Sequence, residues 1–381
     1  MNNEISSMVK NKIAALTGKK KPEVSLILTY NCPLHCSMCN RGAFPTKHGE
    51  RITVDLIEKL PECAYINLTG GEPFTVADID DIVEAALKKA DRVIISTNGY
   101  FTDRIIETCK KYPDVGIRIS IEGMAETNNL IRGVPDGFDR GYKTLMTLRN
   151  MGVKNIGFGM VIQDDNADDV LKLYKLASDL GMEFATTTLH NSFYFAIANN
   201  VIKDRLRVGK ATEDLVNELL RSNSPKKWFR AYYNHGLISY MFNRRLLPCY
   251  MGVDSFFVDP YGDVLPCNGT RKKMVMGNLH TKSWSEIVNS KEAQAICESL
   301  KDCRRCAMVG SMAPAMKTHI VKTSLWVIWH KFKALFTKKP YSMFELKEAR
   351  DFRDGKITKE ELDKGSTCEF GTVIDNGIKN D

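Results

Sequence analysis

The chain has 381 residues, of which 43% are hydrophobic and 26% are charged. This length allows two or three folded units, and the composition excludes a collagenous, a disordered or a multi-span membrane chain. Lys and Arg number 54 and Asp and Glu 46, so the net charge is +8. That excess fits an anionic substrate and does not require nucleic acid, which we do not expect as a partner.

Six short apolar runs alternate with amphipathic stretches between residues 24 and 189. We expect strands at 24–29, 64–69, 92–97, 116–121, 156–162 and 183–189. We expect helices at 53–60, 77–90, 103–112, 138–151 and 167–181. Such an order predicts a parallel α/β sheet, open or curled into a partial barrel, whose ligands bind at the carboxyl ends of the strands.

The second half of the chain has a different pattern. Residues 190–248 are predicted to be a helical connector, with helices at 214–221 and 228–243. A hairpin with a Pro-Tyr-Gly turn is expected over 256–265, inside a cysteine-bearing segment that we interpret as a second, smaller domain.

The segment 320–336 places apolar residues at helical spacing, with three lysines among them. Those lysines exclude a membrane span, which needs about 20 apolar residues. Two interpretations remain: a helix packed on the protein's own core, or a helix that contacts a membrane surface.

Eleven cysteines, an odd number, are spread along the chain. Residues 1–21 contain lysines but no continuous apolar stretch, so we expect no secretory signal and a cytoplasmic location. In a reducing compartment, clustered thiols usually bind metal or take part in chemistry.

Three cysteines follow the first predicted strand in the pattern C-x3-C-x2-C, at Cys32, Cys36 and Cys39. Three thiolates can hold three irons of a [4Fe–4S] cluster and leave the fourth iron open to a ligand. A zinc site completed by His35 or His48 is the alternative.

This loop resembles the signature of radical S-adenosylmethionine (radical SAM) enzymes, whose fold is a partial (β/α)6 barrel like that of TIM. Thr69-Gly70-Gly71-Glu72-Pro73 follows the second strand and resembles the family's GGEP motif. Met38 stands where the family often has an aromatic residue before the third cysteine.

The resemblance implies a set of SAM contacts. Gly70, Gly71, Glu72 and Pro73 would take the methionine amino group, and Arg132 would pair with the carboxylate. Ser96 and Asn98 after the third strand, and Ser120 after the fourth, would complete the set. The cluster would reductively cleave SAM to a 5′-deoxyadenosyl radical, which abstracts hydrogen from the substrate. No residue is identified as a general base.

A second cysteine set consists of Cys249, Cys267, Cys303 and Cys306. It resembles the SPASM extension of radical SAM enzymes, in its one-cluster "twitch" form, so these four would hold an auxiliary [4Fe–4S] cluster; zinc is the alternative. Four other cysteines are interpreted as ordinary thiols: Cys63, Cys109, Cys297 and Cys368.

These interpretations divide the chain into five parts. They are an N-terminal extension (1–21), a radical SAM core (22–200), a helical connector (201–248), a SPASM/twitch domain (249–315) and a basic helical tail (316–381).

The substrate is not encoded in any residue that we identify. Our first hypothesis is oxidation of a sugar-like or cyclitol-like small molecule, an anionic one by the charge, with help from the auxiliary cluster. The alternative is a peptide-modifying maturase, and an alternative of another class is a non-enzymatic iron–sulfur or zinc protein. We expect an electron donor such as flavodoxin or ferredoxin, and contact with the inner membrane face through 320–336.

Overall fold

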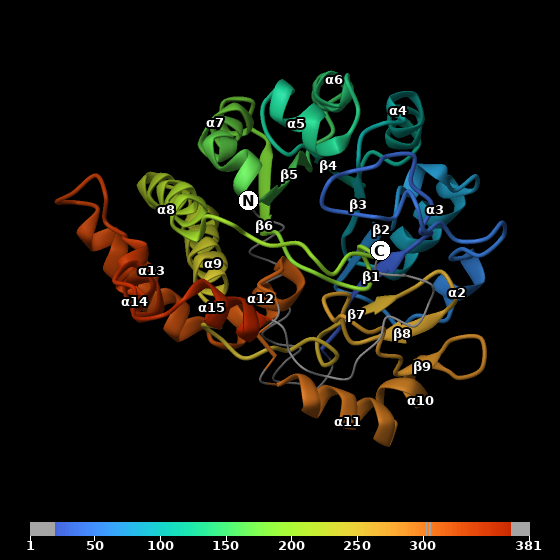
Figure 1. Ribbon diagram of the computed structural model, residues 1–381. Coiled ribbons are helices and arrows are strands. Elements are labelled where there is room, and N and C mark those ends of the chain that lie inside the picture. The colour runs from blue at the N-terminus through green and yellow to red at the C-terminus, as the bar shows by residue number, and fades with distance from the viewer. Residues whose placement is uncertain (1–19, 302, 305, 367–381) are drawn as a thin grey trace.

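The computed structural model describes residues 20–301, 303–304 and 306–366, and shows a curved sheet with helices around its outer side (Figure 1). Its first six strands are all parallel and pair in chain order. Their bounds are β1 Glu23–Ile27, β2 Tyr65–Thr69, β3 Val93–Thr97, β4 Gly116–Ser120, β5 Ile156–Ile162 and β6 Glu183–Thr188. The predicted α/β architecture is confirmed, with each strand within two residues of its predicted bounds.

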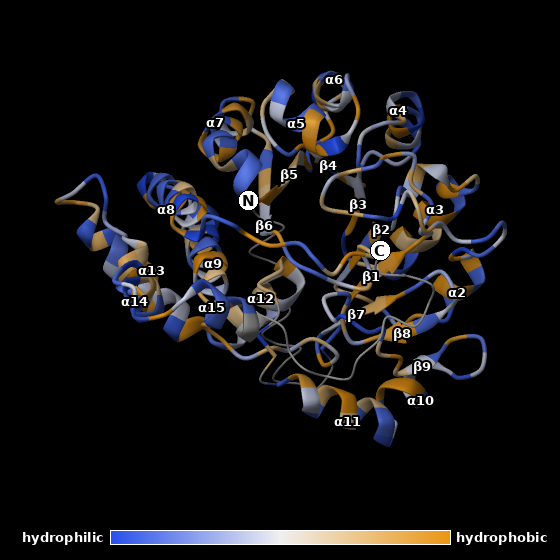
Figure 2. Ribbon diagram, in the orientation of Figure 1, coloured by the Kyte–Doolittle hydropathy of each residue, from blue (hydrophilic) through white to orange (hydrophobic). Residues whose placement is uncertain are grey.

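Helices join these strands and cover the outer side of the sheet. They are α2 Val54–Glu58, α3 Ile79–Lys89, α4 Thr102–Lys111, α5 Ala125–Arg132, α6 Gly137–Asn150 and α7 Val170–Asp179, with 3-10 turns η1 Pro73–Thr75 and η2 Asp164–Asp169. Figure 2 shows apolar residues concentrated in the strands and on helix faces turned toward them. The sequence pattern predicts all of these helices except α5, which is short and has few apolar residues at helical spacing.

Two long helices follow β6 and extend the outer layer. They are α8 Arg205–Arg221 and α9 Pro225–Met241, which pack against each other. Helix α8 begins nine residues before its predicted start, because Asp204 caps it by accepting a hydrogen bond from the backbone of Arg207 (3.0 Å).

The predicted hairpin is present and continues the main sheet. It consists of β7 Ser255–Val258 and β8 Asp263–Leu265, and the short β9 Gly277–Asn278 pairs with β8. Strand β7 pairs in parallel with β1, from Glu23 opposite Ser255 to Leu26 opposite Val258. The strand order is therefore β6-β5-β4-β3-β2-β1-β7-β8-β9, and the cysteine-bearing segment shares one sheet with the barrel.

The remaining helices lie beyond the hairpin. They are α10 Trp284–Val288, α11 Lys291–Leu300, α12 Val309–Thr318, α13 Ile320–Lys333, α14 Lys347–Arg353 and α15 Lys359–Ser366, with a 3-10 turn, η3 Met343–Glu345. Helix α13 packs on α9 and α8 at one edge of the molecule (Figure 1). Within the described ranges, no helix is long and apolar enough to cross a bilayer.

Candidate functional site

The three cysteines of the first loop come together at the carboxyl end of β1. The backbone N–H of Cys39 donates to the carbonyl oxygen of Cys36 (3.1 Å), which closes a turn between them. Burial, together with the nearby Glu72, Cys36 and Cys39, raises the pKa of Cys32 to about 12. The thiolate forms of these three cysteines would repel one another, and a shared cationic centre would remove that repulsion.

Two side chains that follow other strands of the sheet donate to these sulfurs: one lies in the loop after β3, and the other is on α5, which follows β4. The Nδ2 of Asn98, after β3, lies 3.7 Å from the Sγ of Cys32. The Nη1 of Arg132, on α5, lies 3.7 Å from the Sγ of Cys36. The structure therefore brings together residues that are up to 100 positions apart in the sequence, because parallel strands end at the same edge of the sheet.

Gly70 and Gly71 let the end of β2 pack directly on the cysteine loop. A Cβ atom at Gly70 would lie 2.5 Å from the carbonyl oxygen of Thr29, and one at Gly71 would collide with that of Asn31. The backbone N–H groups of Gly71 and Glu72 donate to these same two oxygens, both at 2.7 Å. The two glycines are thus required for contact between loops, in addition to any contact with a ligand.

Glu72 is completely buried and ties the same turn to the end of β3. Its carboxylate accepts hydrogen bonds from the backbone of Phe74 (3.0 Å), the hydroxyl of Thr97 (2.7 Å) and the backbone of Asn98 (2.7 Å). Burial raises the pKa of Glu72, against the effect of these donors. Pro73 follows as the first residue of η1. Both oxygens of Glu72 have protein partners, so its observed contacts position Asn98.

A buried ion pair joins β4 to α5. The Nη2 of Arg132 lies 2.5 Å from the Oε1 of Glu122, whose Oε2 accepts from the backbone of Val161 (2.6 Å). Burial opposes the charge of Arg132, but Glu122 and the Cys36 sulfur outweigh it and keep the Arg132 pKa above its ordinary value. The Nε of Arg132 has no hydrogen-bond partner in the described part of the chain. A buried donor of this kind can bind an anion.

The sequence analysis assigns no role to Glu122, although an acidic residue directly after a predicted strand is a signal that could have identified it. Arg132, Asn98 and Ser120 line one hollow, together with Leu34 and Tyr100. Ser96 lies apart from them, with its hydroxyl donating to Asn67 (2.9 Å).

The four cysteines of the second set come from three segments. Cys249 follows α9, Cys267 follows β8, and Cys303 and Cys306 follow α11. Burial raises the pKa of Cys267, and the other three members of the set raise it further. The structure therefore gathers the four thiols in one place.

Cys297 lies beside this set. Its Sγ donates to the carbonyl oxygen of Gly252 (3.2 Å), and its pKa is raised by burial and by the nearby Cys249. Cys63 and Cys109 are buried in the core, as expected of ordinary thiols, and burial raises both of their pKa values to about 12. Cys368 lies outside the described residues.

The loop after β6 connects the two cysteine sets, which sequence reasoning did not predict. The hydroxyl of Tyr194 donates to the carbonyl oxygen of Gly70 (2.6 Å), and the backbone of Phe193 donates to Thr270 (2.9 Å), three residues after Cys267. Arg41 donates to the carbonyl oxygens of Phe193 and Tyr194 and stacks on Tyr30, 3.9 Å from the ring centre. A small apolar cluster fills the space between: Ile27, Tyr30, Tyr194, Met251, Phe257, Leu265 and Cys267.

The donor chemistry of both sets is that of iron–sulfur sites, which use thiolates. Within the described ranges, no three His, Cys, Asp or Glu side chains are arranged to hold a single metal ion.

Family comparisons agree with this geometry. The model of the radical SAM superfamily matches residues 26–177, and that of SPASM, an iron–sulfur cluster-binding domain, matches 249–307. The chain belongs to the radical SAM superfamily. Its cofactors are SAM and [4Fe–4S] clusters, as the two matched domains require.

Several curated proteins are similar to this chain. The Fe-coproporphyrin III synthase of Methanosarcina barkeri is 28% identical over 183 residues, which are 46% of this chain and 45% of that protein. The antilisterial bacteriocin subtilosin biosynthesis protein AlbA of Bacillus subtilis is 24% identical over 282 residues, 69% of this chain and 58% of that protein. The chain thus spans about half the length of the curated relatives it matches.

The fold is also that of a solved structure. The crystal structure of Streptococcus suis SuiB bound to the precursor peptide SuiA has a TM-score of 0.53 and 15% identity, and the match covers 76% of this chain and 70% of SuiB.

Proposed function

We propose that Cys32, Cys36 and Cys39 hold a [4Fe–4S] cluster whose fourth iron is left for SAM. The observation that carries this proposal is the meeting of the three thiols with Asn98 and Arg132 beside one hollow. Cys249, Cys267, Cys303 and Cys306 then hold the auxiliary cluster. When bound, the first cluster and SAM would provide the radical chemistry that removes a hydrogen atom from an unactivated C–H bond.

The chain's own residues bind and orient SAM. Arg132 has a buried, unpartnered Nε and a positive charge for the SAM carboxylate, and Glu122 fixes its guanidinium. Asn98 and Ser120 line the same hollow. Glu72 is a positioning residue, because it holds the backbone of Asn98 and the turn that contains Gly70 and Gly71.

The substrate that we propose is a peptide. AlbA, whose name assigns it to bacteriocin biosynthesis, aligns over more than two thirds of this chain, and SuiB accommodates a precursor peptide on the same fold. This proposal replaces the sugar or cyclitol, which is our first hypothesis from the sequence. It keeps an electron donor of the flavodoxin or ferredoxin type and a cytoplasmic setting.

The test is 5′-deoxyadenosine formation by anaerobically reconstituted protein with SAM and dithionite, with and without candidate peptides. We expect Cys39→Ala to abolish product and to lower the iron content by about half, because one of two four-iron clusters is lost. We expect Cys267→Ala to retain cleavage of SAM and to lose conversion of the peptide.

Two controls complete this experiment. Cys109→Ala changes a buried thiol on α4 that belongs to neither set, and it should leave iron and product unchanged. Cys297→Ala tests whether the thiol beside the second cysteine set is itself an iron ligand. We expect the iron content of this variant to be unchanged. Loss of iron in Cys297→Ala, or conversion of sugars and not of peptides, would contradict the respective assignment.

A further inference from the structure

Helix α13 and the turn after it expose an apolar stripe. Seven large side chains along 321–336 are 54 to 76% exposed: Val321, Leu325, Ile328, Trp329, Phe332, Leu335 and Phe336. Their spacing places them on one side of the helix. The rings of Trp329 and Phe332 stack at 6.4 Å, and Phe336 meets Phe332 edge-on at 5.2 Å. A contiguous exposed stripe of this kind marks a surface for interaction.

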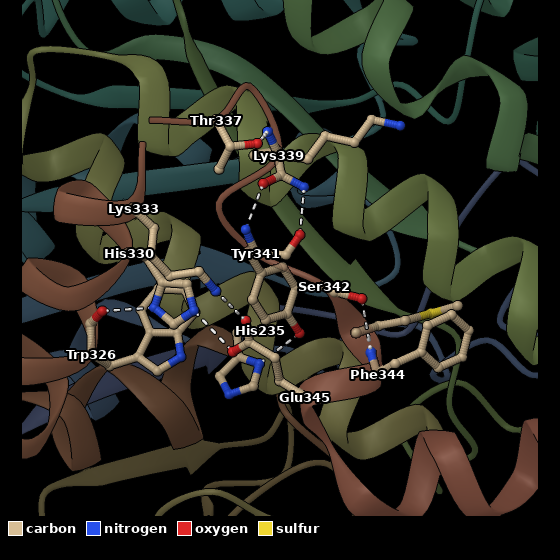
Figure 3. Close-up of polar contacts among 12 residues, drawn as sticks. His235, Trp326, His330, Lys333, Thr337, Lys339, Tyr341, Ser342, Phe344 and Glu345 are labelled. Atoms are coloured by element: carbon tan, nitrogen blue, oxygen red, sulfur yellow. Dashed lines mark hydrogen bonds and ion pairs between the residues drawn. The ribbon is translucent and has the colours of Figure 1, made fainter. Parts of the chain in front are cut away.

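The opposite side of α13 is fixed to the protein (Figure 3). His330, almost completely buried, lies 3.0 Å from the carboxylate of Glu345, which also pairs with Lys333 (2.8 Å). The ring of Trp326 stacks on His235 at 5.0 Å, and His235 bonds to the hydroxyl of Tyr341 (2.7 Å). The stripe faces outward because this anchor, which we call the His330–Glu345 anchor, determines the orientation of the helix.

The sequence around the stripe is positively charged. Residues 303–344 contain no Asp or Glu, and the part from 317 to 339 contains six lysines. Lys322 and Lys331 reach backbone carbonyls of the protein, whereas Lys338 and Lys339 lie exposed just after the stripe ends. Lys333 pairs with Glu345 and Lys317 with Glu23, so Lys338 and Lys339 are the lysines that favour an anionic partner. A second copy of this chain on the same stripe would bring these two lysines near their own counterparts, which is unfavourable.

We propose that this stripe binds the surface of an anionic lipid bilayer, with α13 lying parallel to it. Trp329, Phe332 and their neighbours would enter the boundary between headgroups and acyl chains, and the lysines would contact lipid phosphates. A hollow of about 440 Å³ beside Val321, Lys322 and Leu325 lies next to the stripe and is open to a headgroup. This proposal is independent of the substrate and adds a membrane site to the function proposed above.

The test is co-sedimentation of the full-length protein with vesicles of phosphatidylcholine containing 30 mol% phosphatidylglycerol, and with vesicles of phosphatidylcholine alone. We expect binding to the anionic vesicles, weaker binding to the neutral ones, and loss of binding in high salt. Tryptophan emission should shift to shorter wavelength on binding, because Trp329 is more than half exposed in the free protein.

Two pairs of variants separate the apolar and the charged parts. Trp329→Asp/Phe332→Asp should lower the partition coefficient ~10-fold or more, because each removed ring would otherwise enter the bilayer. Lys338→Glu/Lys339→Glu should lower it by a similar factor for anionic vesicles only. Val253→Asp, at an exposed apolar site elsewhere, and Lys143→Glu/Lys154→Glu are the matched controls and should bind as the wild type does.

Three results would overturn the proposal. They are absence of binding to anionic vesicles, equal binding by Trp329→Asp/Phe332→Asp and wild type, and a wild-type dimer that this variant converts to a monomer without any vesicle binding. The last result would assign the stripe to a second copy of the chain. Circular dichroism of each variant verifies folding, which substitution of exposed side chains should preserve.

Discussion

The edge of the sheet at the cysteine loop and the outer face of α13 depart from ordinary burial in opposite directions. The edge buries Glu72, Glu122 and Arg132, which are of types that proteins normally expose. Helix α13 exposes large apolar side chains, among them Trp329 and Phe332. The first region keeps charged groups out of water, and the second keeps apolar groups in it.

Burying charged side chains and exposing apolar ones both cost free energy in the isolated chain. A bound ligand or a membrane would offset each of these costs. Buried charges are stable only when paired or bonded, and the unpartnered Nε of Arg132 leaves one donor for an anionic ligand. An exposed apolar stripe is stabilised when a bilayer removes it from water. The proposed cofactor site is therefore marked by buried charged side chains, and the proposed membrane site by exposed apolar ones.

The largest effect is expected for Arg132→Met, at the buried edge. It leaves the Glu122 carboxylate without its cation, which should cost about 3–5 kcal/mol of unfolding free energy and abolish measurable SAM binding. Guanidinium unfolding and equilibrium dialysis of the anaerobic protein measure the two effects. Arg149→Met, an exposed control on α6, should change stability by less than about 0.5 kcal/mol. Equal losses in the two variants would contradict the assigned ion pair.

The next effect concerns the anchor that orients α13. Burial, with a smaller effect from the neighbouring His330, lowers the pKa of His235 to about 3. The unfolded chain takes up this proton below pH ~6.5, so stability is present above that pH and falls by about 1.4 kcal/mol per unit as pH decreases. We expect about 2 kcal/mol of loss between pH 7 and pH 5 from this group.

His235→Phe tests that expectation, because the ring can still stack on Trp326 but no longer takes a proton. Unfolding measured at pH 7 and pH 5 should show a smaller loss in the variant. The Glu345 carboxyl, with a pKa lowered to about 2, loses its contribution only below about pH 4.5 and does not interfere. Parallel losses in variant and wild type would show that His235 is not held neutral.

Glu72→Gln should have a smaller effect on stability. The amide keeps one acceptor but turns an N–H toward a backbone donor, at a cost of about 1–3 kcal/mol. Thr97→Val removes only one of the three bonds and should cost about 1 kcal/mol. Thermal unfolding ranks the two variants. A Glu72→Gln variant as stable as the wild type would remove the positioning role.

The smallest effect is expected at the exposed stripe. Leu325→Ser should change the unfolding free energy by less than about 0.5 kcal/mol, because the side chain is already in water. Val327→Ser, two residues along on the buried side of the same helix, should cost about 2 kcal/mol. Chemical denaturation measures the unfolding free energy of both variants. Equal losses would mean that Leu325 is buried against another part of the protein.

Much of the barrel can be predicted from local pattern. The run Val93-Ile94-Ile95 predicts a strand covered on both faces, and β3 is found there with all three side chains buried. The cysteine spacing predicts a [4Fe–4S] loop, because three thiols so close in sequence must be close in space. Helix α5 could not be predicted in this way, since it is a short helix with few apolar residues at helical spacing, although it carries Arg132.

The sequence by itself determined the elements with strong periodicity, the positions of both cysteine sets, and the apolar stripe of 320–336, because each depends on residues near one another in the chain. Only the tertiary structure decided that β7 joins β1, that Glu122 pairs with Arg132, and that the stripe faces outward. The physical reason is that strand neighbours, buried ion pairs and the exposed side of a helix depend on what packs against them. Packing partners lie far apart in the sequence, and periodicity carries no information about which of them will meet.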